Sequence, residues 1–231
     1  MPSLYEFGTA ALRCIYQARI SGPPVFDPPQ VQFPGCLPFM EAWTAIRSEA
    51  LAIAGQLETV PRFQELMPEQ TAISANDGRD WRMFILKAYG IEVRQNMATC
   101  PVLACLIKQA PEVLSAGLSF LAPHKHIPPH FGPFKGILRF HLILSMPMGS
   151  DGKPAVVLKI DDAEHRLADG DGLLWDDTYR HEVRNQSGEV RIALLLDVWR
   201  PHMPADMQVL SRLIILFVQA AMRYRAVSYG G

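Results

Sequence analysis

Cysteine is scarce in this chain, and its spacing is irregular. The four cysteines, Cys14, Cys36, Cys100 and Cys105, include no Cys-x-x-Cys pair. Disulfide frameworks and zinc–thiolate sites are typically recognised by such regular spacings. The sequence therefore predicts reduced cysteines, as in a cytoplasmic enzyme.

Long apolar runs and an excess of charge are also missing. No run of about eighteen apolar residues occurs, which predicts that no helix spans a membrane. The N-terminus lacks the basic segment and apolar run of a signal peptide. A formal net charge of −1 argues against nucleic acid as the main partner, because binding phosphates needs a concentrated positive field. We expect a cytoplasmic protein, with peripheral contact to a membrane left open.

What the chain does contain is enough apolar sequence for a large core. It has 231 residues, of which 49% are hydrophobic, a profile that suits one globular domain. We expect a mostly helical layer over 1–117, a catalytic core over 118–201 and an amphipathic helix over 202–231.

Periodicity separates helices from strands in the first half. Apolar spacing predicts helices over 4–19, 39–57 and 102–114, the last with Pro101 in its first turn. The stretch 81–89 has the composition of a strand.

From about residue 118 the period changes to that of strands. Alternation over 137–145 places Arg139, His141 and Ile143 on one face and Leu138, Phe140 and Leu142 on the other. Further short strands are expected over 156–160, 165–167, 172–175, 181–184 and 191–199. This series predicts a mainly β fold, a double-sheet jelly roll with N-terminal helices and a C-terminal helix.

The C-terminal helix has one broad apolar face, opposite Gln208, Arg212 and Gln219. Its members are Leu210, Leu213, Ile214, Phe217, Val218 and Ala221. Such a helix packs on the barrel or on a second subunit of a homo-oligomer. Arg223 and Arg225 leave open a helix that lies on a membrane surface.

Histidines are the candidate metal ligands. Jelly rolls that hold iron commonly use two histidines and a carboxylate, the first histidine in a His-x-Asp or His-x-Glu pair. Here His130 is followed by Gly132 at the carboxylate position, and His181 lies about fifty residues further on. A zinc site made of His124, His126 and His130 is an alternative, as are histidines without any metal.

Two arginines on predicted strands need partners. An arginine inside an apolar barrel is costly unless it meets a carboxylate. Arg139 and Arg191 could bind an acidic cosubstrate, or they could form structural ion pairs with the aspartates at positions 176, 177 and 197.

The order of these motifs resembles the aspartyl/asparaginyl β-hydroxylase family. The resemblance rests on APHKHIPPHFGPFKGILRFHLIL, WDDTYRHEV and RIALLLDVWRP, and extends from about residue 80 to residue 201. It implies a double-stranded β-helix (jelly roll, cupin-like) and an oxygenase that depends on iron(II), 2-oxoglutarate and O₂. His130 and His181 would be the iron ligands, and Gly132 matches family members that use only two histidines.

The resemblance also implies a cosubstrate site. Ser119 and Arg191 would contact 2-oxoglutarate, His141 would support its metal-bound end, and Arg139 would face cosubstrate or substrate. The aspartates at 176 and 177 could orient His181, or they could cap a turn. The substrate stays open among a peptidyl Asp or Asn, a free amino acid and a lipid acyl chain. A non-catalytic jelly-roll scaffold and a metal-dependent hydrolase or isomerase are the rival interpretations.

Overall fold

Two antiparallel sheets form the centre of the molecule in this computed structural model, which describes residues 4–229. The larger sheet has seven strands in the order β1-β9-β6-β11-β4-β2-β3, and the smaller has four in the order β5-β10-β7-β8. The larger sheet comprises β1 (Val25–Phe26), β9 (Gly172–Trp175), β6 (Ile137–Ser145), β11 (Arg191–Trp199), β4 (Val113–Leu121), β2 (Trp81–Ala88) and β3 (Ile91–Glu92). The smaller comprises β5 (His126–His130), β10 (His181–Asn185), β7 (Val156–Ile160) and β8 (Ala163–His165).

Both sheets contribute to one apolar cluster, which lies between them. Trp81, Leu121 and Trp175 come from the larger sheet, and Leu158 and Val183 from the smaller. The fold is therefore the predicted one, mainly β with added helices. That the whole chain is a single domain stays a prediction.

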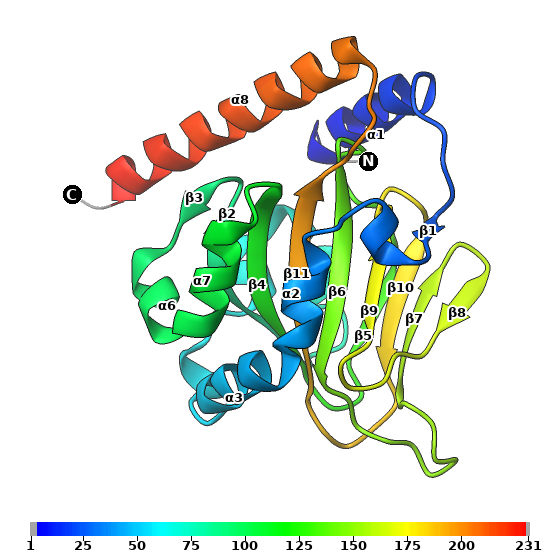
Figure 1. Ribbon diagram of the computed structural model, residues 1–231, viewed down its shortest axis with the longest axis vertical. Coiled ribbons are helices and arrows are strands. Elements are labelled where there is room, and N and C mark those ends of the chain that lie inside the picture. Colours follow the sequence, from blue (N-terminus) through cyan, green and yellow to red (C-terminus); the bar gives the residue numbers. More distant parts are fainter. Residues whose placement is uncertain (1–3, 230–231) are drawn as a thin grey trace.

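Helices cover the other face of the larger sheet. They are α2 (Cys36–Glu41), α3 (Trp43–Ala54), α6 (Arg94–Thr99) and α7 (Pro101–Gln109) (Figure 1). Leu138, Phe140 and Leu142 of β6 belong to the core cluster beneath these helices. The alternation predicted for β6 is confirmed, since His141 and Ile143 instead line a cavity on the opposite face.

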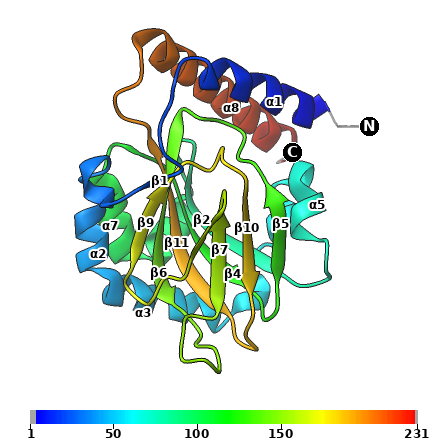
Figure 2. The ribbon, with the colours of Figure 1, turned by 90° about the vertical axis from the view of Figure 1, so that its right-hand side faces the viewer.

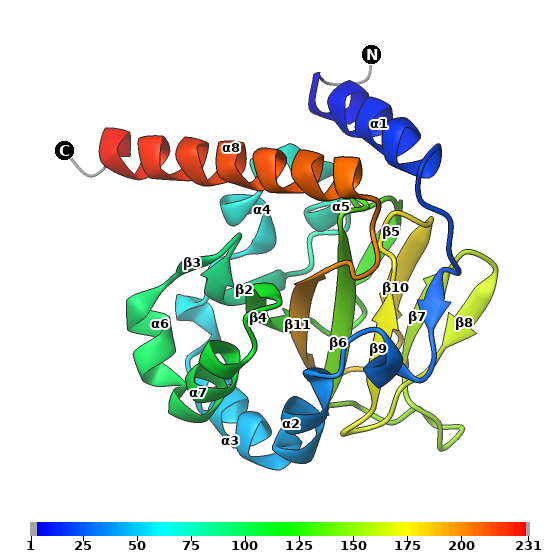
Figure 3. The ribbon, with the colours of Figure 1, turned by 45° about the horizontal axis from the view of Figure 1, so that its top comes forward.

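Short helical turns connect α3 to β2. They are η2 (Leu57–Thr59), α4 (Phe63–Leu66), η3 (Pro68–Gln70) and α5 (Thr71–Ser74), while η1 (Pro29–Val31) follows β1. The first and last helices, α1 (Leu4–Gln17) and α8 (Ala205–Tyr229), lie at one end of the molecule (Figures 2 and 3).

Two predicted helices differ from the observed ones. The helix expected over 39–57 is interrupted at Ala42, where the chain turns so that Phe39 of α2 and Ile46 of α3 both reach the core. The helix expected over 102–114 ends at Gln109, because Val113 already pairs with Val198 of β11. A short apolar run is compatible with either state, and tertiary pairing decided it.

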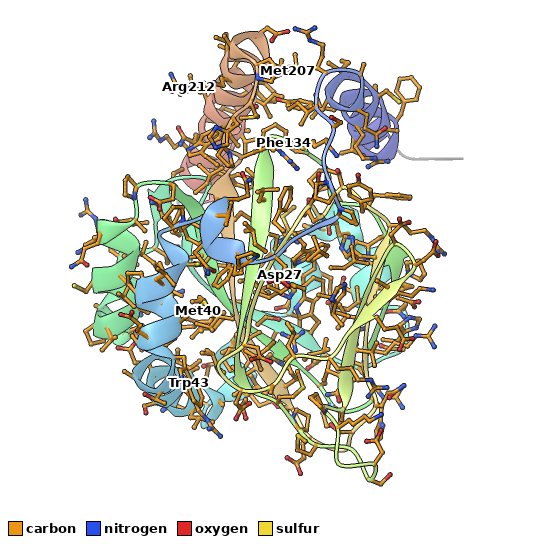
Figure 4. All side chains as sticks on the ribbon, turned by 45° about the vertical axis from the view of Figure 1, so that its right-hand side comes forward. Asp27, Met40, Trp43, Phe134, Met207 and Arg212 are labelled. Atoms are coloured by element: carbon orange, nitrogen blue, oxygen red, sulfur yellow. The ribbon has the colours of Figure 1, made fainter. Side chains whose placement is uncertain are left out.

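The face of α8 that packs on the protein overlaps only in part with the one predicted, since Leu210 and Ile214 of the predicted face pack against the core. Met207, Ser211 and Ile215 are buried, whereas Leu213 and Phe217 are exposed. Figure 4 shows Met207 and Arg212 on different sides of α8, with Phe134 nearby. Because α8 has apolar residues around most of its circumference, periodicity could not select the buried face.

Over Ala205–Tyr224, α8 is long and apolar enough to cross a membrane. Only 17% of that stretch is buried against the rest of the protein. The prediction from unbroken apolar runs missed it, because Gln208, Arg212 and Gln219 interrupt the run. This property rests on the length and composition of α8 alone.

Candidate active site

Two histidines lie side by side where strands β5 and β10 pair. His130 ends β5, His181 begins β10, the two are register partners, and their ring centroids are 4.0 Å apart. The Nδ1 atom of His130 lies 2.8 Å from the carbonyl oxygen of Pro128, and that of His181 lies 2.9 Å from the carbonyl of Tyr179. A carbonyl can only accept, so both Nδ1 atoms donate and both Nε2 atoms keep a free lone pair.

Burial keeps both rings neutral. It lowers the pKa of His130 to about 4, assisted by the charge of Arg139 and partly opposed by the hydrogen bond to Pro128. Burial, followed by the neighbouring His130, lowers the pKa of His181 well below its usual value. Neutral imidazole is the form that binds metals.

A carboxylate stands beside the position where the His-x-Asp pattern is broken. A β-carbon on Gly132 would overlap the carboxylate of Asp177. Asp177 is buried, and neither of its oxygens has a hydrogen-bond partner among the described residues. Burial raises its pKa to about 6, although Arg139, with Nη1 at 3.2 Å, acts in the opposite direction.

The chemistry of these groups fits a metal cation held by two histidines. Within residues 4–229, no three His, Cys, Asp or Glu side chains form a group that could hold a metal. The zinc set proposed from spacing is therefore not assembled: His124 is exposed, and His126 Nε2 lies 2.9 Å from Glu182. His130 and His181 remain as a pair, and the carboxylate of Asp177 lies against Gly132, two residues after His130.

A small cavity of about 20 Å³ lies beside Arg191, lined by residues of β6, β7 and β10 but not by His130 or His181. His141, His165 and Arg191 line it, with walls of aliphatic residues that include Ile143, Leu158 and Val183. Arg191 is buried, its Nη1 has no hydrogen-bond partner in the described part of the chain, and burial lowers its pKa to about 10. A buried guanidinium without an anion is costly, so a cavity of this size beside Arg191 suits a single carboxylate group.

Unlike Arg191, Arg139 is paired with carboxylates of the protein itself. Its Nε and Nη2 donate to the two oxygens of Asp197 at 2.8 and 3.2 Å, and Nη1 faces Asp177. The ion-pair interpretation thus describes Arg139, and the unpaired arginine is Arg191.

Ser119 lies on β4 between Met83 of β2 and Ala193 of β11. It is buried, and its hydroxyl accepts a hydrogen bond of 3.0 Å from Trp81 Nε1. Its position is therefore held by Trp81, and it does not line the cavity that ends at Arg191.

Sequence comparison identifies the family. The model described as aspartyl/asparaginyl beta-hydroxylase matches residues 40–201, more than half of the chain. The chain belongs to this family.

Two relatives illustrate its range. The ornithine lipid ester-linked acyl 2-hydroxylase of Rhizobium tropici is 31% identical over 184 residues, covering 80% of this chain and 63% of that protein. Human aspartyl/asparaginyl beta-hydroxylase is 25% identical over 208 residues, covering 86% of this chain and 26% of the human protein. The chain thus spans less than two thirds of either relative. Among solved structures, a prolyl-4-hydroxylase from Pseudomonas putida matches 83% of this chain and 98% of its own, with 16% identity and a TM-score of 0.45.

Two residues near the candidate active site, His165 and Trp175, had no role predicted from the sequence. His165 at the end of β8 lines the cavity, and its Nε2 is buried without a partner among the residues described. Trp175 stands edge-on to His141 and His181, with ring centroids at 5.4 and 4.6 Å. Strand alternation around each residue was the available signal, but it does not show which strands meet.

Of the two roles left open for the aspartates before His181, orienting the ring is wrong for Asp176 and capping a turn is confirmed, because its Oδ1 accepts a hydrogen bond from the Thr178 amide at 3.1 Å. Its carboxylate binds Lys135 Nζ at 2.8 Å, Arg200 Nη2 and the hydroxyl of Thr178. His181 is oriented by the Tyr179 carbonyl instead. Asp176 therefore holds the loop before β10 in place, while Asp177 faces the site.

Proposed function

We propose that this protein is an iron(II)- and 2-oxoglutarate-dependent hydroxylase. The observation that carries the proposal is the pair of neutral histidines on the smaller sheet together with an unpaired, buried arginine, Arg191, in a cavity that His141 and Val183 also line. Membership of a hydroxylase family supports the same chemistry.

The two histidines would hold the metal through Nε2. The carbonyls of Pro128 and Tyr179 fix the tautomer and the ring orientation, which favours metal binding because the ligands need no rearrangement. Two neutral imidazoles leave the charge of iron(II) uncompensated. Asp177 would supply a negative charge close to Gly132, which occupies the position of the carboxylate in the His-x-Asp pattern.

Arg191 would bind the far carboxylate of 2-oxoglutarate. The planar guanidinium suits bidentate contact with a carboxylate, and the aliphatic walls exclude water from the ion pair. His141, whose pKa burial lowers well below its usual value, stays neutral beside the cosubstrate path and can donate a hydrogen bond without adding charge. Bound iron(II) supplies the activation of O₂ that lets a hydroxylase oxidise a C–H bond.

For the substrate, we infer an acyl chain of a lipid. The support is the 31% identity with a protein named as a lipid acyl 2-hydroxylase, against 25% for the human aspartyl/asparaginyl hydroxylase. A peptidyl aspartate or asparagine and a free amino acid are the substrates to compare.

Anaerobic titration of the metal-free protein with iron(II) and then 2-oxoglutarate tests the cofactors. We expect a weak visible charge-transfer band from the chelate. It should disappear in His181→Ala and in Arg191→Ala. Metal binding without a band would favour the hydrolase interpretation, and no metal binding would favour the scaffold.

The substrate is tested in air by formation of succinate from 2-oxoglutarate. Lipid extracts, peptides that contain Asp or Asn, and free amino acids are compared, and mass spectrometry checks each for the gain of one oxygen atom. Stimulation by peptides alone would overturn the lipid assignment while leaving the cofactors established.

A further inference from the structure

Helix α8 has two opposite apolar faces, and only one of them is covered. Met207, Ser211 and Ile215 recur every four residues and are buried against the protein. On the other side, five large apolar or aromatic residues are exposed: Val209, Leu213, Leu216, Phe217 and Tyr224. At about 100° per residue these five occupy a sector of roughly 100°, so they form a single stripe along the helix.

The charges beside this stripe are positive. Arg212 and Arg223 are exposed and are eleven residues, or about three turns, apart, so they lie along one flank of the stripe. Neither has an ion-pair partner among the described residues. The acidic residue of α8, Asp206, is bound by Arg19 of the α1 connection at 2.7 Å. The uncompensated charge of this surface is therefore basic.

Helix α1 extends the surface towards the candidate active site. The hydroxyls of Tyr16 and Ser211 are 2.7 Å apart, which fixes α1 against α8. Phe7 of α1 is 69% exposed. Both helices lie at the same end of the molecule (Figures 1 and 3), so one flat partner could contact both.

Arg13 of α1 connects this surface to the histidine pair. Its guanidinium lies 5.0 Å from the ring centroid of Phe131, and its Nη1 donates to the carbonyl of Gly132 at 3.4 Å. Phe131 follows the metal-ligand candidate His130 directly and is 49% exposed. Exposed apolar side chains thus occur on α8, on α1 and on the loop that carries His130.

We propose that α8 and α1 form a docking surface for an anionic lipid bilayer, with α8 lying in the plane of the interface. An exposed apolar stripe with a basic flank is the pattern of an interfacial helix. Arg212, in the middle of the stretch, and the packing of Met207 and Ile215 on the protein both favour this orientation over a helix that crosses the bilayer. Docking would place the Phe131 loop at the membrane surface. The proposal goes beyond the hydroxylase activity and can be tested without turnover.

Vesicle co-sedimentation of the metal-free chain tests the surface. We expect binding to vesicles of mixed phosphatidylglycerol and phosphatidylcholine, and much weaker binding to phosphatidylcholine alone or at high salt. The double variant Leu213→Ser/Phe217→Ser should bind about tenfold or more weakly, since two large apolar contacts are lost. Arg212→Gln/Arg223→Gln should lose about fivefold for each arginine, on anionic vesicles only.

The matched control is Leu37→Ser/Leu51→Ser, which removes two exposed leucines from α2 and α3. It should bind vesicles like the unaltered protein, and circular dichroism should show that every variant is folded. Equal binding by the α8 variant and this control, or no binding by the unaltered protein, would overturn the proposal.

A dimer by light scattering that the Leu213→Ser/Phe217→Ser variant converts to a monomer would assign the stripe to a second copy of the chain and would likewise overturn it. The iron and 2-oxoglutarate titration is independent of all these outcomes, so the two proposals can fail separately.

Discussion

The carboxylate of Asp177 occupies the space into which any side chain at residue 132 would project. A side chain in place of the glycine in the His-Phe-Gly sequence would therefore force Asp177 to move, and the backbone amide of Gly132 also donates to the Asp177 carbonyl. Positions 132 and 177 are therefore coupled. A carboxylate lies where the side chain of residue 132 would be, but it belongs to Asp177 in the loop before β10.

This relationship predicts how a conventional carboxylate ligand would behave. Gly132→Asp should destabilise the protein by about 1–3 kcal/mol, through overlap and through repulsion between two carboxylates. It should also weaken iron(II) binding in an anaerobic titration. The double variant Gly132→Asp/Asp177→Gly removes the overlap and should recover both stability and metal binding. A double variant no better than Gly132→Asp would show that the two positions do not compensate.

Arg191 and Arg200 are both buried, but only Arg200 has a carboxylate partner, Asp176. Arg191→Met should leave the metal-free protein as stable as before or about 1–2 kcal/mol more stable, because an unpaired buried charge is removed. Arg200→Met should cost about 3 kcal/mol, since it breaks a buried ion pair. Urea unfolding of both variants measures this difference.

With iron(II) and 2-oxoglutarate present, the order of stability should reverse, so that the unaltered protein becomes more stable than Arg191→Met. The unaltered protein should gain about 2.7 kcal/mol when free ligand is a hundred times its dissociation constant, and Arg191→Met should gain almost nothing from 2-oxoglutarate. If Arg191→Met destabilises the metal-free protein as much as Arg200→Met does, Arg191 is a structural residue.

His165 should contribute to cosubstrate binding from the side of the cavity. Its Nε2 is buried without a described partner, and it lines the same cavity as Arg191. Losing one hydrogen bond to a charged group costs about 1.4 kcal/mol or more, so His165→Leu should raise the dissociation constant for 2-oxoglutarate about tenfold. Iron(II) affinity should not change. The exposed His124, replaced by Asn, is the control, and equal 2-oxoglutarate affinities in the two variants would exclude the role.

Acid should weaken the structure at the buried Lys125. Its Nζ donates to Asp77 Oδ1 at 2.6 Å and to the Ser74 carbonyl at 2.7 Å, which holds α5 against β5. Burial acts to raise the pKa of Asp77, but hydrogen bonds from the His126 amide and from Lys125 outweigh it, so the pKa is lowered. The stabilisation is therefore complete above the ordinary aspartate pKa of about 3.9 and is lost as the pH falls through the lowered value.

Asp77→Asn should thus cost about 2 kcal/mol in the free energy of unfolding at pH 7. The difference from the unaltered protein should shrink as the pH falls below about 4. Urea unfolding at a series of pH values measures it. A difference that stays constant down to pH 3 would show that the carboxylate charge is not what stabilises this pair.

Local sequence determined most of the strands and the facing of their side chains. The two-residue period over β6 assigns Leu138 and Phe140 to the helix-covered core and His141 to the opposite face, and the structure has this arrangement. A strand's period is a property of the backbone, so it can be derived without knowing its neighbours. Residue type and order made His130 and His181 candidates among several histidines, and the resemblance to the hydroxylase family selected this pair.

Only the tertiary structure decided which groups meet. Strand register brings His130 opposite His181, and the loop before β10 sends Asp176 to Arg200 and Asp177 to Gly132. Arg139 forms an ion pair with Asp197 on the neighbouring strand, whereas Arg191 has no partner in the described part of the chain. Likewise, α8 has two apolar faces, and the position of α1 and the strands decided which one is buried. These outcomes depend on contacts between residues far apart in sequence, which local periodicity does not encode.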